Sequence, residues 1–362
     1  MQQVRLLNRL LAISFAVGLA AASSDAHAQF YKGKTLTFLV NYGAGGNADT
    51  AARMFQRHIA RHIAGSPNVV VQNMPGAGGY AAMNNLGLNV NRKPDGLTAG
   101  YFGLSPPGLI ARDPGLRVTM RDFAMIGAAR DWGVAYVRKD TAPGINQPAD
   151  FAKAKQVFAG GYARSNSNDA RSSLALQVFN VPYRMVTGFS GTADLNKAMM
   201  QNEINYITSA LPAFQRLAMP QLIKTGIAIP VFYYPVANAD GTPGEIPAFE
   251  RMGVSSFHKV YQQAFGKPPS GPRFEALLLL CDLGSNTHGV IALPKDAPAE
   301  AVADLRTAFN ALKTDRAFIE EYEKLTRESP SLVTAEELAP VLQRLETVRP
   351  EVIQVVKDTI GM

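Results

Sequence analysis

Two glycine-rich segments of the sequence have the pattern of anion-binding loops. FLVNYGAGGNADTAARMF (38–55) joins an apolar stretch to a helical pattern, and VVVQNMPGAGGYAAMNN (69–85) repeats this plan. A helix N-terminus offers unpaired N–H groups and the positive end of the helix dipole, and glycine lets a negative group come close. The first segment therefore predicts a site for a ligand carboxylate, whereas we expect the second to anchor a helix beneath it.

Asp49, at the start of the first predicted helix, has two interpretations. A carboxylate in the first turn of a helix caps unpaired N–H groups or complements the helix dipole. The same carboxylate next to a glycine-rich loop could instead contact a ligand. Both interpretations stay open on the sequence alone.

The glycine-rich segments do not support an enzyme. Gly76, Gly78 and Ala81 fit the dinucleotide fingerprint G-x-G-x-x-A, but Pro75 interrupts the turn and Asp95 lies in a Pro-Asp-Gly turn. No lysine of the phosphate-binding-loop type follows either segment, and the chain has no G-x-S-x-G motif. We therefore predict no catalytic residues and no cofactor, and we do not expect an enzyme.

His58 and His62 have the helical spacing of a metal-binding pair. The surrounding RHIARHI lacks the glutamate of zinc proteases, and its two arginines would repel a cation. We interpret this stretch as a solvated basic face and predict no metal site. The single cysteine, Cys281, lies in ALLLLCDL, where a buried structural thiol is expected.

The N-terminus predicts export from the cytoplasm. Two arginines precede a short apolar run (10–22), and an Ala-His-Ala sequence ends at Ala28. This is the pattern of a secretory signal peptide, so we expect cleavage after Ala28. The formal net charge of the 362 residues is +7, but the basic residues are scattered and do not suggest nucleic-acid binding.

Strand and helix patterns alternate along most of the chain. TLTFLV (35–40), NVVVQN (68–73) and LTAGYF (97–102) read as strands with helical patterns between them. The middle of the chain repeats the plan, and the C-terminal part is helical, with a capping box at Thr334 and Glu337. This alternation predicts a layered α/β fold with a largely parallel sheet.

Taken together, these segments resemble the Bug family, the extracytoplasmic receptors of tripartite tricarboxylate transporters. FLVNYGAGGNADTAARMF, NMPGAGGYAA and RKPDGLTAGYF resemble three successive family signatures in order and spacing over 34–102. VPYRMVTGFSGTADLNKAMMQNEINYI resembles a fourth, and IALPKDAPAEAVADLRTAFNAL resembles the C-terminal part. Each motif is weak alone, but four in order are specific, and the resemblance covers most of the chain.

The resemblance implies an α/β fold like that of type II periplasmic binding proteins, with two lobes, two hinge crossings and a ligand cleft between the lobes. The signal peptide (1–28) would precede the first part of lobe one (29–131), lobe two (132–235) and the second part of lobe one (236–362). A stretch near 257–285 looks like an insertion. The family resemblance further implies a periplasmic monomer that binds a small organic carboxylate and passes it to membrane permease subunits.

Members of the family hold a carboxylate largely with main-chain amides at strand-to-helix loops. Carried onto this sequence, the resemblance implies ligand-binding residues in both lobes. In lobe one they are Tyr42, Gly43, Ala44, Gly45, Gly46, Asp49 and Ser105. In lobe two they are Arg164, Ser165, Asn166, Ser167, Asn168, Gly188, Phe189, Ser190, Gly191, Thr192 and Ser209.

The chain departs from the family pattern within the implied site. Asn41 and Tyr42 replace the usual proline after the first strand, and the lobe-two loop GGYARSNSNDARSS is unusually polar and rich in arginine. Arg164 or Arg171 could reach a second, distal carboxylate of the ligand, or could be a solvated arginine at a helix start. The identity of the carboxylate therefore stays open.

The first functional hypothesis is a receptor that delivers a carboxylate to a permease. A ligand-sensing module for a signalling kinase would use the same fold, and an exported enzyme is a further alternative. A neighbouring gene for a permease or for a kinase would separate the first two. Turnover of a bound ligand would indicate the third.

Overall fold

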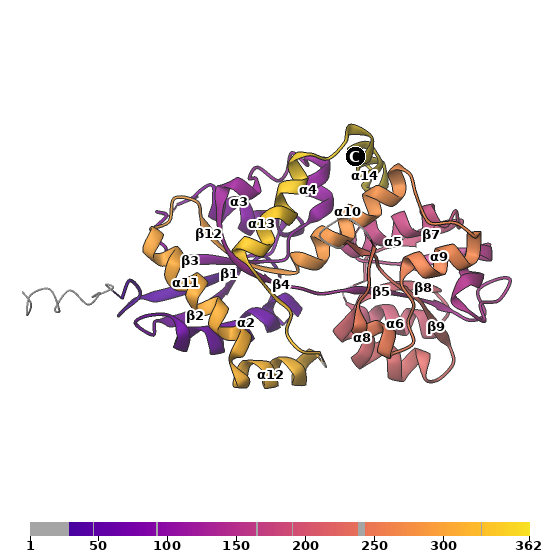
Figure 1. The fold of residues 1–362 in the computed structure, drawn as a ribbon, viewed down its shortest axis with the longest axis horizontal. Helices are drawn as coiled ribbons and strands as arrows, with labels where there is room; N and C mark the ends of the chain where they lie inside the picture. The colour runs from indigo at the N-terminus through magenta and orange to yellow at the C-terminus, as the bar shows by residue number, and fades with distance from the viewer. Residues whose placement is uncertain are drawn as a thin grey trace, which may run out of the picture.

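The computed structural model describes residues 29–45, 47–91, 93–163, 166–189, 191–237, 243–326 and 328–362. Two β-sheets with helices on both faces form two lobes that lie end to end (Figure 1). The expected α/β architecture with two lobes is confirmed. The expectation of a largely parallel sheet is wrong, because both sheets mix parallel and antiparallel pairs. The predicted signal peptide lies outside the described residues.

The first sheet takes its strands from both ends of the chain. The strands predicted near the N-terminus are present and parallel, with β1 between β2 and β3, and β12 runs antiparallel between β3 and β4. In spatial order the strands are β13 (Leu332–Thr334), β4 (Phe123–Ala129), β12 (Gly289–Pro294), β3 (Thr98–Phe102), β1 (Thr35–Val40) and β2 (Asn68–Asn73).

The second sheet uses only the middle of the chain. β6 is parallel to β7 and β8, whereas β5 is antiparallel to β8 and β9. In spatial order the strands are β7 (Tyr183–Val186), β6 (Val157–Gly160), β8 (Tyr206–Ala210), β5 (Gly133–Arg138) and β9 (Ala228–Tyr233). A short antiparallel pair, β10 (Val236–Ala237) and β11 (Pro243–Gly244), follows.

Helices cover both faces of the first sheet. The stripe expected on the first helix is confirmed, because Ala52, Phe55, Ile59 and Ile63 are all buried. The helical elements here are α2 (Asn47–Ile59), η1 (Ala60–His62), η2 (Ala77–Gly79), α3 (Tyr80–Gly87), α4 (Pro106–Ala111), η3 (Met120–Asp122), α11 (Ala299–Ala311), η6 (Leu312–Thr314), α12 (Arg316–Thr326), α13 (Ala335–Gln343), η7 (Arg344–Glu346) and α14 (Pro350–Ile360). The predicted capping box of Thr334 and Glu337 starts α13.

Helices also cover both faces of the second sheet. α7 continues into the π-helix η5, which contains Pro220, a residue that cannot donate a helical hydrogen bond. The elements here are η4 (Pro148–Lys153), α5 (Ser167–Val178), α6 (Thr192–Met200), α7 (Leu211–Ala213), η5 (Phe214–Ile223), α8 (Pro247–Arg251), α9 (Phe257–Phe265) and α10 (Pro272–Asn286).

Helix α10 connects the two lobes. It packs against α5 of the second lobe and against α4, α13 and α14 of the first, so one hydrophobic core runs through both (Figure 1). Cys281 lies in α10 and is buried as predicted, and burial raises the pKa of its thiol to about 12. The stretch that looked like an insertion forms α9 and most of α10.

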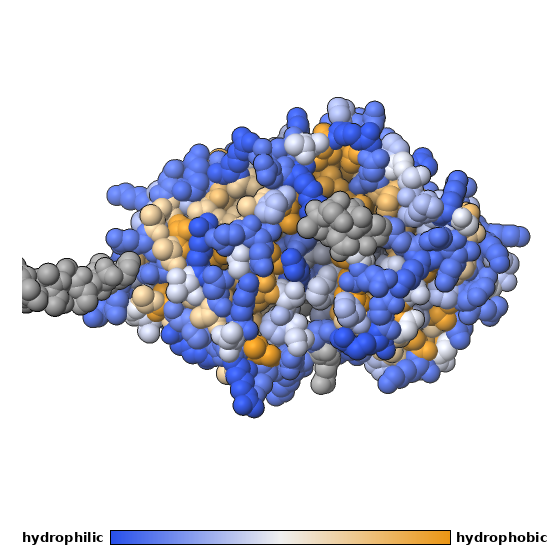
Figure 2. Space-filling model, viewed as in Figure 1, coloured by the Kyte–Doolittle hydropathy of each residue, from blue (hydrophilic) through white to orange (hydrophobic). Residues whose placement is uncertain are grey.

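The surface is largely polar. On the face shown in Figure 2, hydrophilic side chains cover most of both lobes and hydrophobic ones show in smaller areas between them. Among the described residues, no helix combines the length and apolar character that crossing a membrane requires.

Candidate ligand-binding site

The two sheets face each other with the ends of their strands. The ends of β1, β3 and β4 and the start of β12 share one edge of the first sheet. The ends of β6, β7 and β8 and the start of β5 share one edge of the second. Residues 130–132 connect β4 directly to β5, so the loops after these strands approach one region from both lobes (Figure 1).

Asn41 organises the loop that follows β1. Its buried side chain bridges to the end of β3, where Nδ2 donates to the Gly103 carbonyl (2.9 Å) and Oδ1 accepts from the Gly103 N–H (3.1 Å). A Cβ at Gly79 would lie 2.6 Å from Asn41 Nδ2, so only glycine fits there. The second glycine-rich segment thus packs α3 against the end of β1, which favours the anchoring role expected for it.

Asp49 holds the first glycine-rich loop in place. Oδ2 accepts from the Gly45 N–H (2.9 Å) and from Arg53 Nε (3.0 Å), and Oδ1 accepts from Asn73 Nδ2 (3.0 Å) and Arg53 Nη2 (3.0 Å). The Arg53 hydrogen bond has the largest effect on the carboxyl, and together with those from Gly45 and Asn73 it outweighs burial and lowers the pKa of Asp49 to about 2. Both oxygens are occupied, which favours the anchoring interpretation of Asp49.

The hydrogen bond to Asp49 also occupies the backbone N–H of Gly45. The expectation was that its amide faces the ligand, but in this structure the Gly45 N–H is donated to Asp49. Gly45 has φ of +80°, a conformation that glycine adopts without strain. Gly45 therefore shapes the loop.

Tyr42 and Ser105 come close together through Tyr80. A Cβ at Gly103 would lie 3.0 Å from Tyr42 Cε2, so the Tyr42 ring packs over the end of β3. The Tyr80 hydroxyl donates to Asp113 (3.2 Å) and is hydrogen-bonded to Ser105. Burial is the main cause that raises the pKa of Tyr80 to about 12. Two residues expected in the lobe-one site thus share one surface.

Asp169 in lobe two repeats the arrangement of Asp49. Each is the third residue of its helix, after the loop that follows a strand. Asp169 Oδ2 accepts from the backbone N–H groups of Tyr162 (2.6 Å) and Ala163 (2.7 Å). Burial outweighs these two hydrogen bonds and raises the pKa of Asp169 to about 7, because no cation pairs with it among the described residues.

The two lobe-two loops are joined to each other. The Gly188 N–H donates to the Tyr162 carbonyl (3.1 Å), and the Phe189 N–H donates to the Gly161 carbonyl (3.3 Å). The hydroxyls of Tyr162 and Thr192 lie 3.2 Å apart. The structure therefore brings the residues predicted around 188–192 next to the loop that starts α5.

The first turn of α5 combines a cap with an unused hydroxyl. Asn166 is the N-cap residue, and its Oδ1 accepts from the Asn168 N–H (2.9 Å). Ser167 Oγ is buried and has no hydrogen-bond partner in the described part of the chain. Ser209, at the end of β8, is buried beside the Tyr136 phenol on the other face of the sheet.

Four of the predicted site residues, Gly46, Arg164, Ser165 and Ser190, lie outside the described residues. Of the two arginines considered for a second carboxylate, the structure therefore describes only Arg171. Its side chain is buried where the lobes join, and Nη2 donates to Asn168 Oδ1. The interpretation as a solvated arginine is thus wrong for Arg171.

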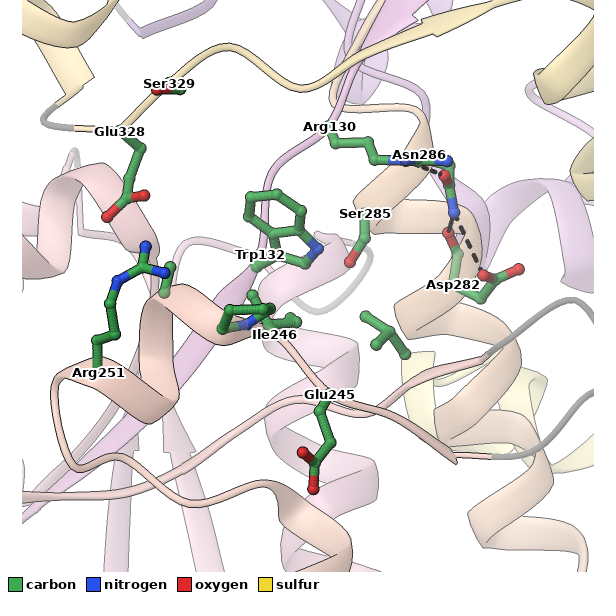
Figure 3. Close-up of a pocket in the computed structure, with 13 residues that line it drawn as sticks. Arg130, Trp132, Glu245, Ile246, Arg251, Asp282, Ser285, Asn286, Glu328 and Ser329 are labelled. Atoms are coloured by element: carbon green, nitrogen blue, oxygen red, sulfur yellow. Dashed lines mark hydrogen bonds between the residues drawn. The ribbon is translucent and has the colours of Figure 1, made fainter.

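A cavity of about 410 Å³ lies at the hinge between the lobes. Figure 3 shows Trp132 near its centre, with Arg130 held by Asn286 on one side and Glu328 and Arg251 pointing toward each other on another. None of the predicted ligand-binding residues that the structure describes lines this cavity. Sequence analysis missed it because its residues come from five separate segments; the only signal was a single tryptophan where the chain passes between the lobes.

The histidine pair is part of an ion network, so the prediction of a solvated basic face is wrong. His58 Nε2 lies 2.6 Å from Glu321 Oε2, and His62 Nε2 lies 2.7 Å from Asp315 Oδ2. Burial alone would raise the pKa of Asp315, but hydrogen bonds from His62 and Arg61 hold it below its usual range. The network joins α2 and η1 to α12, and the described residues contain no cluster suited to a metal ion.

Proteins of known structure have a fold similar to that of this chain, although sequence comparisons found no match. No protein-family model matches the sequence, and no curated protein sequence matches it. A TctC solute-binding protein from Polaromonas, without ligand, has a similar structure at 20% identity, covering 91% of this chain and 99% of its own, with a TM-score of 0.61. MatC from Rhodopseudomonas palustris with bound malate is 19% identical over 90% of this chain and 98% of its own, with a TM-score of 0.59.

The periplasmic binding protein BugD is a further similar structure, at 14% identity, 91% coverage of this chain, 99% of its own and a TM-score of 0.59. The chain has the fold of TctC- and Bug-type solute-binding proteins. The resemblance stated from the sequence motifs is thus confirmed at the level of the fold. The Polaromonas protein is described as a solute-binding protein and BugD as a periplasmic binding protein.

Proposed function

We propose that this protein is a periplasmic receptor that binds a small organic carboxylate and delivers it to the permease subunits of a tripartite tricarboxylate-type transporter. The supporting observation is the likeness in fold, over nearly the whole of both chains, to solute-binding proteins, one of which holds malate. Loops that approach one region from both lobes suit a receptor that closes on its ligand about a hinge.

The proposed site lies between the lobe built on the first sheet and the lobe built on the second. The second lobe also contains α8 and α9, which pack on its sheet, so the expected end of lobe two at residue 235 is too early. In lobe one the ligand would meet the loop at Tyr42 to Gly46 and the Ser105 hydroxyl, with Asp49 holding the loop from behind. In lobe two it would meet the starts of α5 and α6, where helix N-termini favour a carboxylate.

The proposal includes the route to the periplasm and the state of the mature protein. A signal peptide cleaved after Ala28 would release a chain that starts at Gln29. This mature protein would act as a monomer and bind its ligand without metal, nucleotide or other cofactor. Its partners would be the carboxylate and the permease.

A thermal-shift screen of the mature protein against mono-, di- and tricarboxylates tests the proposal. A carboxylate at one hundred times its dissociation constant should stabilise the fold by about 2.7 kcal/mol, with no change on adding a chelator. The proposal would be wrong if no carboxylate shifted the unfolding temperature. Loss of binding in chelator that zinc restores would contradict the metal-free part, and turnover of the ligand would indicate an enzyme.

A further inference from the structure

The guanidinium of Arg171 is buried with unused donors. The residue is 7% exposed, and among the described residues only Nη2 of its three nitrogens has a hydrogen-bond acceptor, Asn168 Oδ1. Nε and Nη1 are buried and have no partner among the described residues. Burying charged donors without an acceptor is unfavourable, so this geometry indicates an acceptor that the described residues do not provide.

Two glycines and a tyrosine ring line the buried guanidinium. A Cβ at Gly133 would lie 3.5 Å from Nη1, and one at Gly284 would lie 3.7 Å from it, so both flanking positions are glycine. The Tyr234 ring lies on another side, with its centroid 5.6 Å from Cζ. Asp131 acts on Arg171 electrostatically, but its Oδ2 lies 3.6 Å from His288.

The start of α5 adds to the positive potential around Arg171. The side chain turns back toward the helix N-terminus, since Nη2 reaches Asn168 one turn earlier. Ser167 lies four residues before Arg171, on the same face of the helix, and its buried Oγ also lacks a partner within the described part of the chain. A guanidinium, a hydroxyl and the positive end of a twelve-residue helix therefore converge.

Arg171 also lies next to the lobe-one site. A Cβ at Gly284 would lie 3.7 Å from Arg171 Nη1 and 4.0 Å from Pro106 Cγ, so α10 brings these two residues to a common point. Pro106 directly follows Ser105, which shares its surface with Tyr42 through Tyr80. The guanidinium thus lies near the residue that follows Ser105, which belongs to the proposed lobe-one site.

We infer that Arg171 is a specificity-determining residue that binds the second carboxylate of a dicarboxylate ligand when the lobes close. The inference rests on the proposed function, because the first carboxylate occupies the proposed lobe-one site. A carboxylate offers two acceptors that match Nε and Nη1 of one guanidinium, which a hydroxyl or methyl group cannot do. The receptor would therefore select dianions over monoanions of the same length.

Calorimetric titration with matched acids tests this inference. Malate and 2-hydroxybutyrate differ only in that a methyl group replaces the second carboxylate, and adipate and hexanoate form a longer pair. The wild-type protein should bind at least one dicarboxylate at least tenfold more tightly than its partner. Arg171→Leu should weaken that dicarboxylate at least tenfold and leave the monocarboxylate within about twofold.

Two further variants separate binding from folding. Arg171→Lys keeps the charge but loses the paired donors, so it should keep the fold and still weaken the dicarboxylate selectively. Arg184→Leu removes an exposed arginine of the same lobe and should change neither ligand. Equal affinity for both members of each pair in the wild type, or equal weakening of both in the Arg171 variants, would overturn the inference alone. Absence of binding to any carboxylate would overturn the proposed function as well.

Discussion

Asp49 and Asp169 have the same structural role, which is to accept a hydrogen bond from a loop N–H, but their pKa values shift in opposite directions. Each is the third residue of a helix and accepts a backbone N–H from the preceding loop. Asp49 has Arg53 beside it, which lowers its pKa to about 2, whereas burial without a cation raises the pKa of Asp169 to about 7. The sequence identified Asp49 but left its role open, and it gave Asp169 no role, although the matching position in the two helices was visible.

Replacing Asp49 with asparagine should destabilise the protein by roughly 1–2 kcal/mol at pH 7, because the hydrogen-bonded ion pair with Arg53 is lost. The folded pKa lies below the unfolded value, so this contribution is present above about pH 4 and is lost as the pH falls toward 2. Urea unfolding at pH 7 and pH 3 should show the difference from wild type shrinking at the lower pH. Equal stability of the two proteins at pH 7 would contradict the anchoring role.

Asp169→Asn is the matched control. The folded pKa lies above the unfolded value, so ionised Asp169 reduces stability progressively as the pH rises from about 4 through 7. Asparagine keeps an oxygen for the N–H groups of Tyr162 and Ala163 but carries no buried charge. At pH 8 this variant should be as stable as wild type or more so, and a loss above about 1 kcal/mol would show that the carboxylate is needed.

At the scale of elements, the strands and the loop positions could be predicted from sequence, but the use of the loop amides could not. The alternation of patterns gave β1, β2 and β3, and the glycine-rich segments gave the loops at the sheet edge. Side chains at helix and strand ends, such as Asp49 and Asn41, accept hydrogen bonds from some of the loop N–H groups and so determine which of them stay free for a ligand. The packing of α10 between the lobes could not be predicted either, because a hydrophobic pattern does not identify the elements that a helix contacts.

Gly45→Val should weaken ligand binding at least tenfold while the fold survives. The residue has φ of +80°, which costs a β-branched residue about 1–2 kcal/mol, and no neighbouring atom lies within 4 Å of a Cβ there. The strain would therefore distort the loop and move its amides without creating a clash. Calorimetric titration with the tightest carboxylate of the screen measures the effect.

Gly226→Val provides the control for backbone strain. Gly226 has φ of +77° and no atom within 4 Å of a Cβ, but it lies in the turn before β9, at the far edge of the second sheet. It should lose similar stability to Gly45→Val and keep wild-type affinity. Wild-type affinity in a folded Gly45→Val protein would mean that the carboxylate site lies elsewhere.

For the whole molecule, the arrangement of the two lobes carries the proposed function. The lobes are joined by the crossing at 130–132, by α10 and by a hydrogen bond from Gln215 Nε2 to Glu328 Oε1 (2.6 Å). The family resemblance predicted the two lobes, but the hinge cavity arises only once these segments come together. Rotation of the lobes about the crossing would change the lining of this cavity, although the cavity lies outside the proposed site.

Intrinsic fluorescence should therefore follow ligand binding. Trp132 is the single tryptophan of the chain and lies in the crossing, where it lines the hinge cavity with Arg130 and Glu328 (Figure 3). Lobe closure about this crossing changes the polarity around the indole, so a saturating carboxylate should change the emission intensity or wavelength. The midpoint of that change should equal the calorimetric dissociation constant, and Trp132→Phe should lose the signal but keep affinity within about threefold. Unchanged emission with ligand bound would mean that binding does not move the lobes at this crossing.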